Sequence, residues 1–239
     1  MRWLLLLAAA AALDEAPFEL RDVHGPPPAK AAVGLPLLFE PRVKLWWPAL
    51  DAVVDIAQDA ASPYDAPTTL WPAGAVLAHA LAADCASWKD RVILELGCGV
   101  GAAALALARC GAKRVVATDL SEAALALAAN NTNGTAVTQV LNWDDDGTLR
   151  NVLAAHGPFF AVVGAALKFE DWPLGRLDAV LGVLDPPIVV FAHAWDDNDD
   201  VDDLLGDAWR RAASFSGAAV GLEEFSAVTW VRRAPAGDL

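Results

Sequence analysis

The sequence predicts an α/β domain, in which helices cover both faces of an open, mostly parallel sheet. Apolar segments of strand length alternate with helical segments through the second half of the chain, as expected for parallel strands that are buried on both faces. A glycine-rich turn joins the first of these strands to its helix. Hydrophobic residues make up 56% of the 239 residues and charged residues 20%, so the chain can fill a large core.

The expected elements follow one another from residue 37 onward. Residues 37–61 suit a small hairpin or an N-terminal lobe, and the segment 68–84 opens a helix with Pro72 in its first turn, where a missing N–H is tolerated. Ser121 is a plausible N-cap of a later helix. The expected strands are 91–96, 114–119, 136–141, 159–167, 187–193, 217–222 and 225–231, and the helices between them are 102–110, 121–131, 148–155, 171–182 and 202–214.

The first 36 residues are expected to precede the domain, which we place at 37–239. Residues 1–13, "MRWLLLLAAAAAL", combine a basic residue, a short apolar run and small residues, as a signal peptide does. A frayed apolar N-terminus is the alternative, and residues 17–36 form a Pro-rich linker. The apolar run is too short to span a bilayer, so we expect no transmembrane segment. Two locations stay open: cytoplasmic, or secretory or organellar if residues 1–13 are a signal.

The net charge of −14 bears on the partners of the protein. A phosphate backbone needs a basic surface, so the charge argues against a nucleic-acid partner and leaves room for a basic protein substrate. The segment 196–203, "DDNDDVDD", holds six aspartates. This acidic run either attracts a Lys-rich substrate or is a solvated acidic loop.

Cysteine and histidine give no sign of a metal site. The three cysteines, Cys85, Cys98 and Cys110, lack metal-ligand spacing, and we expect each to be a small buried thiol. The four histidines are scattered without a metal-binding motif. We therefore expect no bound metal.

The stretch "ELGCGVG" is the first candidate site. Its glycines, Gly97, Gly99 and Gly101, alternate in a turn whose backbone N–H groups can face a ligand without a Cβ in the way. Asp119 ends the next strand, where a carboxylate can accept hydrogen bonds from both hydroxyls of a ribose. A dinucleotide-binding turn would have the spacing G-x-G-x-x-G, so a nicotinamide-dependent oxidoreductase is disfavoured.

These motifs resemble those of the seven-stranded S-adenosylmethionine (SAM) methyltransferases, where "ELGCGVG" is similar to the first motif. Within them, the chain resembles the small protein-lysine methyltransferases of methyltransferase family 16. The similar segments are "LWPAGAVLAHAL" at 70–81, "LNWDD" at 141–145 and "VVGAALKF" at 162–169. The resemblance implies a Rossmann-like seven-stranded sheet, SAM as the cofactor, and a protein side chain, lysine, as the methyl acceptor.

The resemblance also implies roles for the residues around the glycine turn. The turn from Gly97 to Gly101 approaches the methionine part of SAM, and Asp119 binds the ribose. Glu95 either anchors the turn or reaches the amino group of the cofactor through water.

Three residues outside the turn complete the cofactor site implied by the resemblance. Trp143 lies against the adenine, since a flat apolar ring suits the face of a base. Trp71 helps to close the pocket near the methionine end, and Ala165 lines it at the fourth strand. Each tryptophan is one of ten in the chain, and packing in the core is the alternative for both.

One position departs from the family pattern and leaves the catalytic residues unknown. Family members generally carry an acidic residue where this chain has Ala166, whereas their aromatic residue is kept as Phe169. Glu170 and Asp171 follow closely and are candidates to substitute for the lost acid. The alternative function is therefore a weak or inactive methyltransferase-fold protein that acts as an interaction module.

Overall fold

The computed structural model describes residues 40–59, 61, 66–167, 175–194, 201 and 205–232. The signal-like stretch and linker, the segment 169–171 and the acidic run other than Val201 lie outside these residues. Within the described ranges, no helix is long and apolar enough to cross a membrane.

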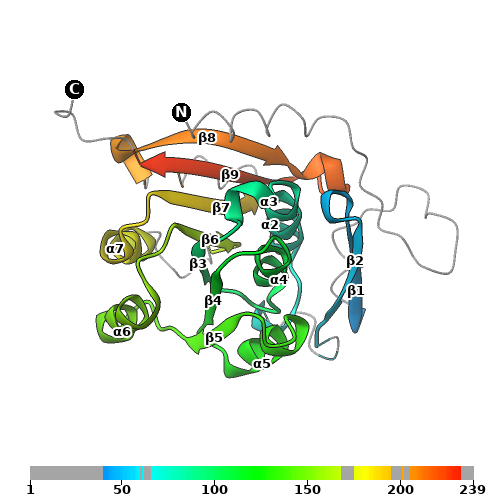
Figure 1. Ribbon diagram of the computed structural model, residues 1–239, viewed down its shortest axis with the longest axis horizontal. Helices are drawn as coiled ribbons and strands as arrows, with labels where there is room; N and C mark the ends of the chain where they lie inside the picture. The colour runs from blue at the N-terminus through cyan, green and yellow to red at the C-terminus, as the bar shows by residue number, and fades with distance from the viewer. Residues whose placement is uncertain are drawn as a thin grey trace, which may run out of the picture.

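A seven-stranded sheet forms the centre of the molecule, in the order β5-β4-β3-β6-β7-β9-β8 (Figure 1). The five strands from β5 to β7 are parallel, whereas β9 runs antiparallel to both β7 and β8. The strands are β3 (Val92–Leu96), β4 (Arg114–Asp119), β5 (Val137–Val140), β6 (Ala161–Ala165), β7 (Ile188–Ala194), β8 (Trp209–Ser216) and β9 (Phe225–Arg232). The predicted α/β architecture with seven strands is confirmed.

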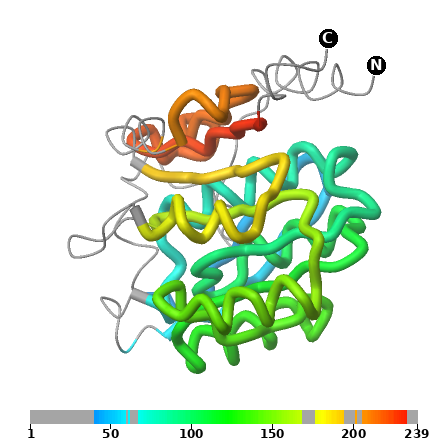
Figure 2. The backbone as a smooth tube through the Cα atoms, turned by 90° about the vertical axis from the view of Figure 1, so that its left-hand side faces the viewer, coloured from blue at the N-terminus to red at the C-terminus, as the bar shows by residue number. Residues whose placement is uncertain are grey.

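Helices cover both faces of this sheet. Figure 1 shows α2, α3, α4 and α5 on one face and α6 and α7 on the other, and Figure 2 looks onto the face covered by α6 and α7. The helices are α2 (Pro72–Ala83), α3 (Cys85–Trp88), α4 (Ala102–Arg109), α5 (Glu122–Asn131), α6 (Asp146–His156) and α7 (Gly175–Leu184). Strand β3 is buried on both faces, since Ile93 packs in the cluster of α2 and α4 while Leu94 and Leu96 pack in the cluster of α7.

An antiparallel hairpin adds a further layer outside the helices. It consists of β1 (Arg42–Trp47) and β2 (Ala52–Ala57), joined through the 3-10 turn η3 (Pro48–Leu50). Alternate side chains of β1 (Val43, Leu45 and Trp47) are buried in the same cluster as those of α2 and α4. Helices α2 and α4 therefore lie between the hairpin and the sheet (Figure 1). The predicted hairpin is confirmed.

The predicted helix at 202–214 is wrong over its second half. After Val201, Leu205 and the 3-10 turn η5 (Gly206–Ala208), the chain forms β8, and the segment predicted as a strand at 217–222 contains the 3-10 turn η6 (Gly217–Val220) instead. A β-bulge in β8 explains the error. Because the bulge shifts the register, Trp209 and Phe215 are buried on opposite faces of the sheet, and the alternation that marks a strand is lost from the sequence.

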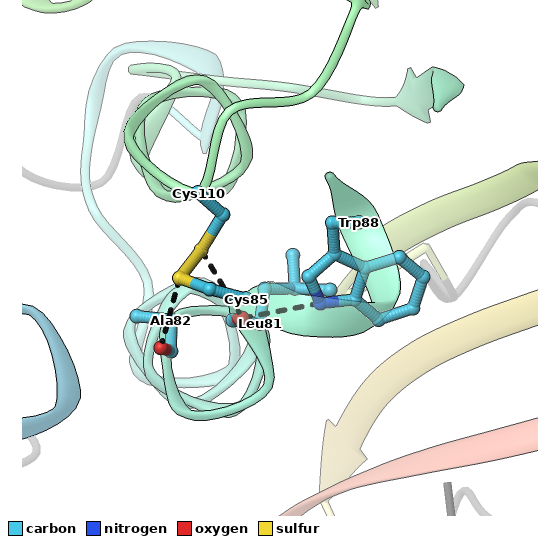
Figure 3. Close-up of a disulfide and its surroundings, with 5 residues drawn as sticks. All are labelled: Leu81, Ala82, Cys85, Trp88 and Cys110. Carbon is cyan, nitrogen blue, oxygen red and sulfur yellow. Dashed lines mark hydrogen bonds between the residues drawn. A yellow bond between two sulfur atoms is a disulfide. The ribbon is translucent and has the colours of Figure 1, made fainter. Parts of the chain in front are cut away.

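The expectation of three buried thiols is also wrong, since Cys85 and Cys110 form a disulfide (Figure 3). The bond joins the first residue of α3 to Cys110, the residue directly after α4, with 4.5 Å between the Cα atoms. The indole Nε1 of Trp88 donates a hydrogen bond to the carbonyl oxygen of Leu81 beside this bond, at 3.1 Å. Sequence spacing could not reveal the pair because it depends on how α2 and α4 pack. Cys98 is a buried free cysteine, as expected.

Candidate functional site

The glycine turn leaves the carboxyl end of β3 and leads into α4. Its three glycines all have positive φ, at 60° for Gly97, 49° for Gly99 and 80° for Gly101, a conformation that other L residues rarely adopt. Gly97 is exposed and Gly99 is half-buried, whereas Gly101 is buried. A Cβ at Gly101 would lie 2.7 Å from the Cβ of Ala128 on α5. Gly97 and Gly99 can therefore face a ligand, whereas Gly101 allows α5 to pack closely against the turn.

Asp119 lies beside this turn at the carboxyl end of β4. Its Oδ2 accepts a hydrogen bond of 2.9 Å from the N–H of Gly99, and its Oδ1 accepts one of 2.9 Å from the N–H of Ser121. A carboxylate oxygen can accept more than one hydrogen bond, so both oxygens keep capacity for a ligand hydroxyl. The half-buried carboxylate thus holds the turn and remains able to bind a ribose.

Glu95 lies beneath the turn rather than in it. Its side chain is only 4% exposed, and its carboxyl accepts a hydrogen bond from the backbone N–H of Ala104 in the first turn of α4. Burial, with a smaller contribution from the nearby Asp119 carboxylate, raises the pKa of Glu95 to about 8, against the opposing effect of the Ala104 hydrogen bond. Among the residues that the structure describes, none forms a hydrogen bond with its Oε2 atom. Of the two predicted roles, this position supports anchoring of the turn.

Cys98, within the turn, has no features of a nucleophile. Burial, together with the neighbouring carboxyl groups of Glu95 and Asp119, raises the pKa of its thiol well above the ordinary value. The thiolate, which is the reactive form of cysteine, is therefore disfavoured. The N–H of Cys98 donates a hydrogen bond of 2.8 Å to the carbonyl of Thr118 and so fastens the turn to β4.

Trp143 follows β5 and is largely buried. Its side chain is 6% exposed and packs among apolar residues that include Leu141 and Leu149. Arg176, on α7, donates a hydrogen bond to the backbone carbonyl of Trp143, and its Nε lies 3.2 Å from a carboxylate oxygen of Asp144. The indole therefore belongs to the core at this edge of the sheet, and its backbone is fixed to α7.

Leu120 is an apolar residue at the same edge that the sequence interpretation missed. It follows Asp119 directly, and 58% of its surface is exposed, the largest value among the exposed large hydrophobic side chains of the described residues. An exposed leucine beside a strand-end carboxylate offers an apolar contact for a base whose ribose is bound at Asp119. The signal was present in the sequence as "TDLS", an apolar residue between the acid and the helix cap.

Trp71 lies directly before α2 and is half-buried. The segment that leads to it runs beside the glycine turn, because a Cβ at Gly99 would lie 3.4 Å from the carbonyl oxygen of Pro67 and 4.0 Å from that of Thr69. The segment before Trp71 therefore lies beside the glycine turn, and the role of Trp71 in closing the pocket stays a prediction.

Ala165 ends β6, which neighbours β3 in the sheet. Ala166 follows with a φ of 51°, in the left-handed region that Asn and Asp tolerate better than alanine. Leu167 is 5% exposed, and one of its methyl carbons lies 3.2 Å from the position of a Cβ on Gly97. The end of β6 and the glycine turn are therefore adjacent. Ala166, at the position where the family pattern has an acid, has a backbone conformation that suits an aspartate.

Thus the carboxyl ends of β3, β4 and β6 bring the glycine turn, Asp119 and Ala165 to one edge of the sheet. The segment before Trp71 lies beside the same turn, and Trp143 follows β5. Within the described ranges, no group of three or more His, Cys, Asp or Glu side chains is arranged to hold a metal ion.

Comparison with known proteins agrees with this arrangement. A family model described as "Methyltransferase domain" matches residues 93–184. An electron transfer flavoprotein beta subunit lysine methyltransferase of Mus musculus is 33% identical over 85 residues, which are 35% of this chain and 30% of that protein. The chain thus matches less than a third of that curated relative.

Solved structures share the fold at low sequence identity. A putative SAM-dependent methyltransferase from Streptococcus mutans has a TM-score of 0.57 at 10% identity, covering 80% of this chain and 56% of that chain. A tRNA (uracil-54, C5)-methyltransferase from Pyrococcus abyssi, in complex with S-adenosyl-L-homocysteine (SAH), has a TM-score of 0.51 at 18% identity, covering 80% and 44%. The fold therefore does not exclude nucleic-acid acceptors, which charge alone had argued against.

The fold is the one that these solved methyltransferases share. Residues 93–184 match a methyltransferase domain, so the chain has a methyltransferase fold.

Proposed function

We propose that the chain is an N-methyltransferase that binds SAM at the carboxyl edge of β3 and β4 and modifies a lysine side chain of a protein. The observation that carries the proposal is the link between Asp119 and the glycine turn. One carboxylate accepts hydrogen bonds from Gly99 and Ser121, so the groups proposed to bind the ribose and the methionine part are built as one unit.

The residues present fit the cofactor. Asp119 accepts hydrogen bonds from the ribose hydroxyls, the exposed Leu120 provides apolar surface for the adenine, and Gly97 and Gly99 admit the methionine part. SAM supplies a methyl group that is already activated on a sulfonium. The protein has to bind it, exclude water and align a neutral acceptor nitrogen behind the methyl group.

Two observations favour a protein as the acceptor. The curated relative is named as a lysine methyltransferase of a protein subunit, and the net charge of −14 suits a basic protein better than a polyanion. The disulfide between Cys85 and Cys110 favours an oxidising compartment among the two locations that the sequence left open, because disulfides are rare in the cytosol.

A second candidate function is favoured by one residue. Ala166 stands where the family carries an acid, and alanine cannot orient an incoming nitrogen or accept its proton. In this alternative the chain binds SAM and acts as an interaction module with little or no methyl transfer.

A labelling experiment separates these functions. The full-length chain is incubated with SAM labelled in the methyl group and with total protein and total RNA from the source organism. Protease-sensitive label that yields methyl-lysine on hydrolysis supports the proposal, and RNase-sensitive label overturns the protein acceptor. SAM binding without transfer to either fraction favours the interaction module.

A further inference from the structure

A single amide side chain connects the glycine turn to the N-terminal hairpin. Asn131, the last residue of α5, accepts a hydrogen bond of 2.9 Å from the N–H of Ala57 at its Oδ1. Its Nδ2 donates two hydrogen bonds of 2.8 Å, one to the carbonyl of Ala57 on β2 and one to the carbonyl of Val100 in the glycine turn. The amide therefore bridges three segments that are far apart in the sequence.

The hydrogen bond from Asn131 fixes the glycine turn at Val100, one residue beyond the positions that Thr118 and Asp119 fix. Cys98 is fixed through its N–H by Thr118, and Gly99 through its N–H by Asp119. Asn131 fixes the carbonyl of Val100, which comes next in the chain. Because glycine-rich backbone has more conformational freedom to lose than any other, each such bond reduces the entropy that a ligand would otherwise have to remove.

The end of the hairpin reaches the turn by a second route. The side chain of Gln58 is 6% exposed, and its Oε1 accepts a hydrogen bond of 2.7 Å from the N–H of Leu70, while the N–H of Asp59 donates one of 3.0 Å to the carbonyl of Thr68. The segment so held is the one whose carbonyl oxygens lie beside Gly99. Residues 57–59 thus support the glycine turn from two sides.

We propose that the N-terminal hairpin is part of the cofactor site and that Asn131 is the positioning residue that fixes the glycine turn to it. This proposal rests on the proposed function, since the turn is taken to bind the methionine part of SAM. Asn131 acts through the backbones of Ala57 and Val100 and takes no part in the chemistry.

The test compares two ligands that share their nucleoside but differ in the amino-acid part. SAH carries that part, whereas 5′-methylthioadenosine lacks it. In the Asn131→Asp variant the Nδ2 donors are replaced by a carboxylate oxygen that faces the carbonyls of Ala57 and Val100. We expect the variant to bind SAH at least about tenfold more weakly than the wild-type full-length chain, and 5′-methylthioadenosine within about twofold.

Two further variants control for folding and for charge. Asn130→Asp makes the same change on an exposed neighbour and should bind both ligands as the wild type does. Gln58→Leu removes the side-chain hydrogen bond of the second route and should also weaken SAH selectively, without adding a charge. Dissociation constants are measured by calorimetry at a temperature at which thermal unfolding shows every variant to be folded.

The outcomes distinguish the two proposals. If the wild-type chain binds neither ligand, the proposed function fails. If the wild type binds SAH but Asn131→Asp and Gln58→Leu lower the unfolding temperature without changing the ratio of the two dissociation constants, Asn131 is merely structural and the inference is wrong.

Discussion

Replacing Glu95 with glutamine should remove a pH dependence from the free energy of unfolding. The pKa of Glu95 is raised from 4.5 to about 8 by burial, so between these values the folded chain holds a proton that the unfolded chain has lost. The stabilisation that comes from this proton is therefore fully present below the pKa of the unfolded chain. As the pH rises toward the pKa of the folded chain, the free energy of unfolding falls by about 1.4 kcal/mol per pH unit. From pH 5.5 to 7.0 the wild type should lose about 2 kcal/mol relative to Glu95→Gln.

The assay is urea unfolding of both proteins at the two pH values. His79 has the opposite effect, because burial lowers its pKa to about 4 and the unfolded chain takes up the extra proton as pH falls below 6.5. Its contribution is the same in both proteins and cancels in the difference between them. Equal pH dependence of the wild type and Glu95→Gln would refute the interpretation that Glu95 is a buried, protonated anchor of the turn.

Three further predictions concern the disulfide, the glycines and Ala166. Replacing both Cys85 and Cys110 with serine should lower the free energy of unfolding by about 3.5 kcal/mol, the value expected for a bridge that closes a loop of 25 residues. Denaturant curves that show no loss of stability would contradict this. Gly101→Ala should destabilise the chain by at least about 1 kcal/mol more than Gly134→Ala, because both glycines have positive φ but only Gly101 is crowded. Equal unfolding midpoints of the two variants would contradict the close packing of α5 against the turn. Ala166→Asp should leave the thermal midpoint unchanged within about 2 °C and raise the rate of methyl transfer, and an unchanged rate would show that the lost acid does not limit turnover.

The fold was largely predictable because its signals are local. Near-continuous apolar strands, Pro72 at the first turn of α2 and the Ser121 cap, which accepts a hydrogen bond of 3.3 Å from the N–H of Ala124, all lie within a few residues of the elements they define. Strand β8 was missed because its bulge hides the alternation, and the disulfide because its cysteines meet only through helix packing.

The candidate site likewise contains residues that sequence motifs predict and residues that no local pattern predicts. The glycine turn and Asp119 belong to sequence motifs, so their proximity could be expected from parallel strands that end at one edge. Asn131 and Arg176 act through backbone carbonyls of segments remote in sequence, and no pattern in the chain marks them. The deep position of Glu95 could not be foreseen either, since it depends on how α4 begins.

The most direct test of the proposed cofactor site is a calorimetric titration of the full-length chain with SAH, beside Asp119→Ala and Glu122→Gln. Glu122 is an exposed acid at the start of α5, so its variant controls for the loss of a nearby charge. Binding by the wild type and Glu122→Gln, and none by folded Asp119→Ala, is the predicted result. Absence of binding by the wild type, or undiminished binding by Asp119→Ala, would contradict the placement of the cofactor at this edge of the sheet.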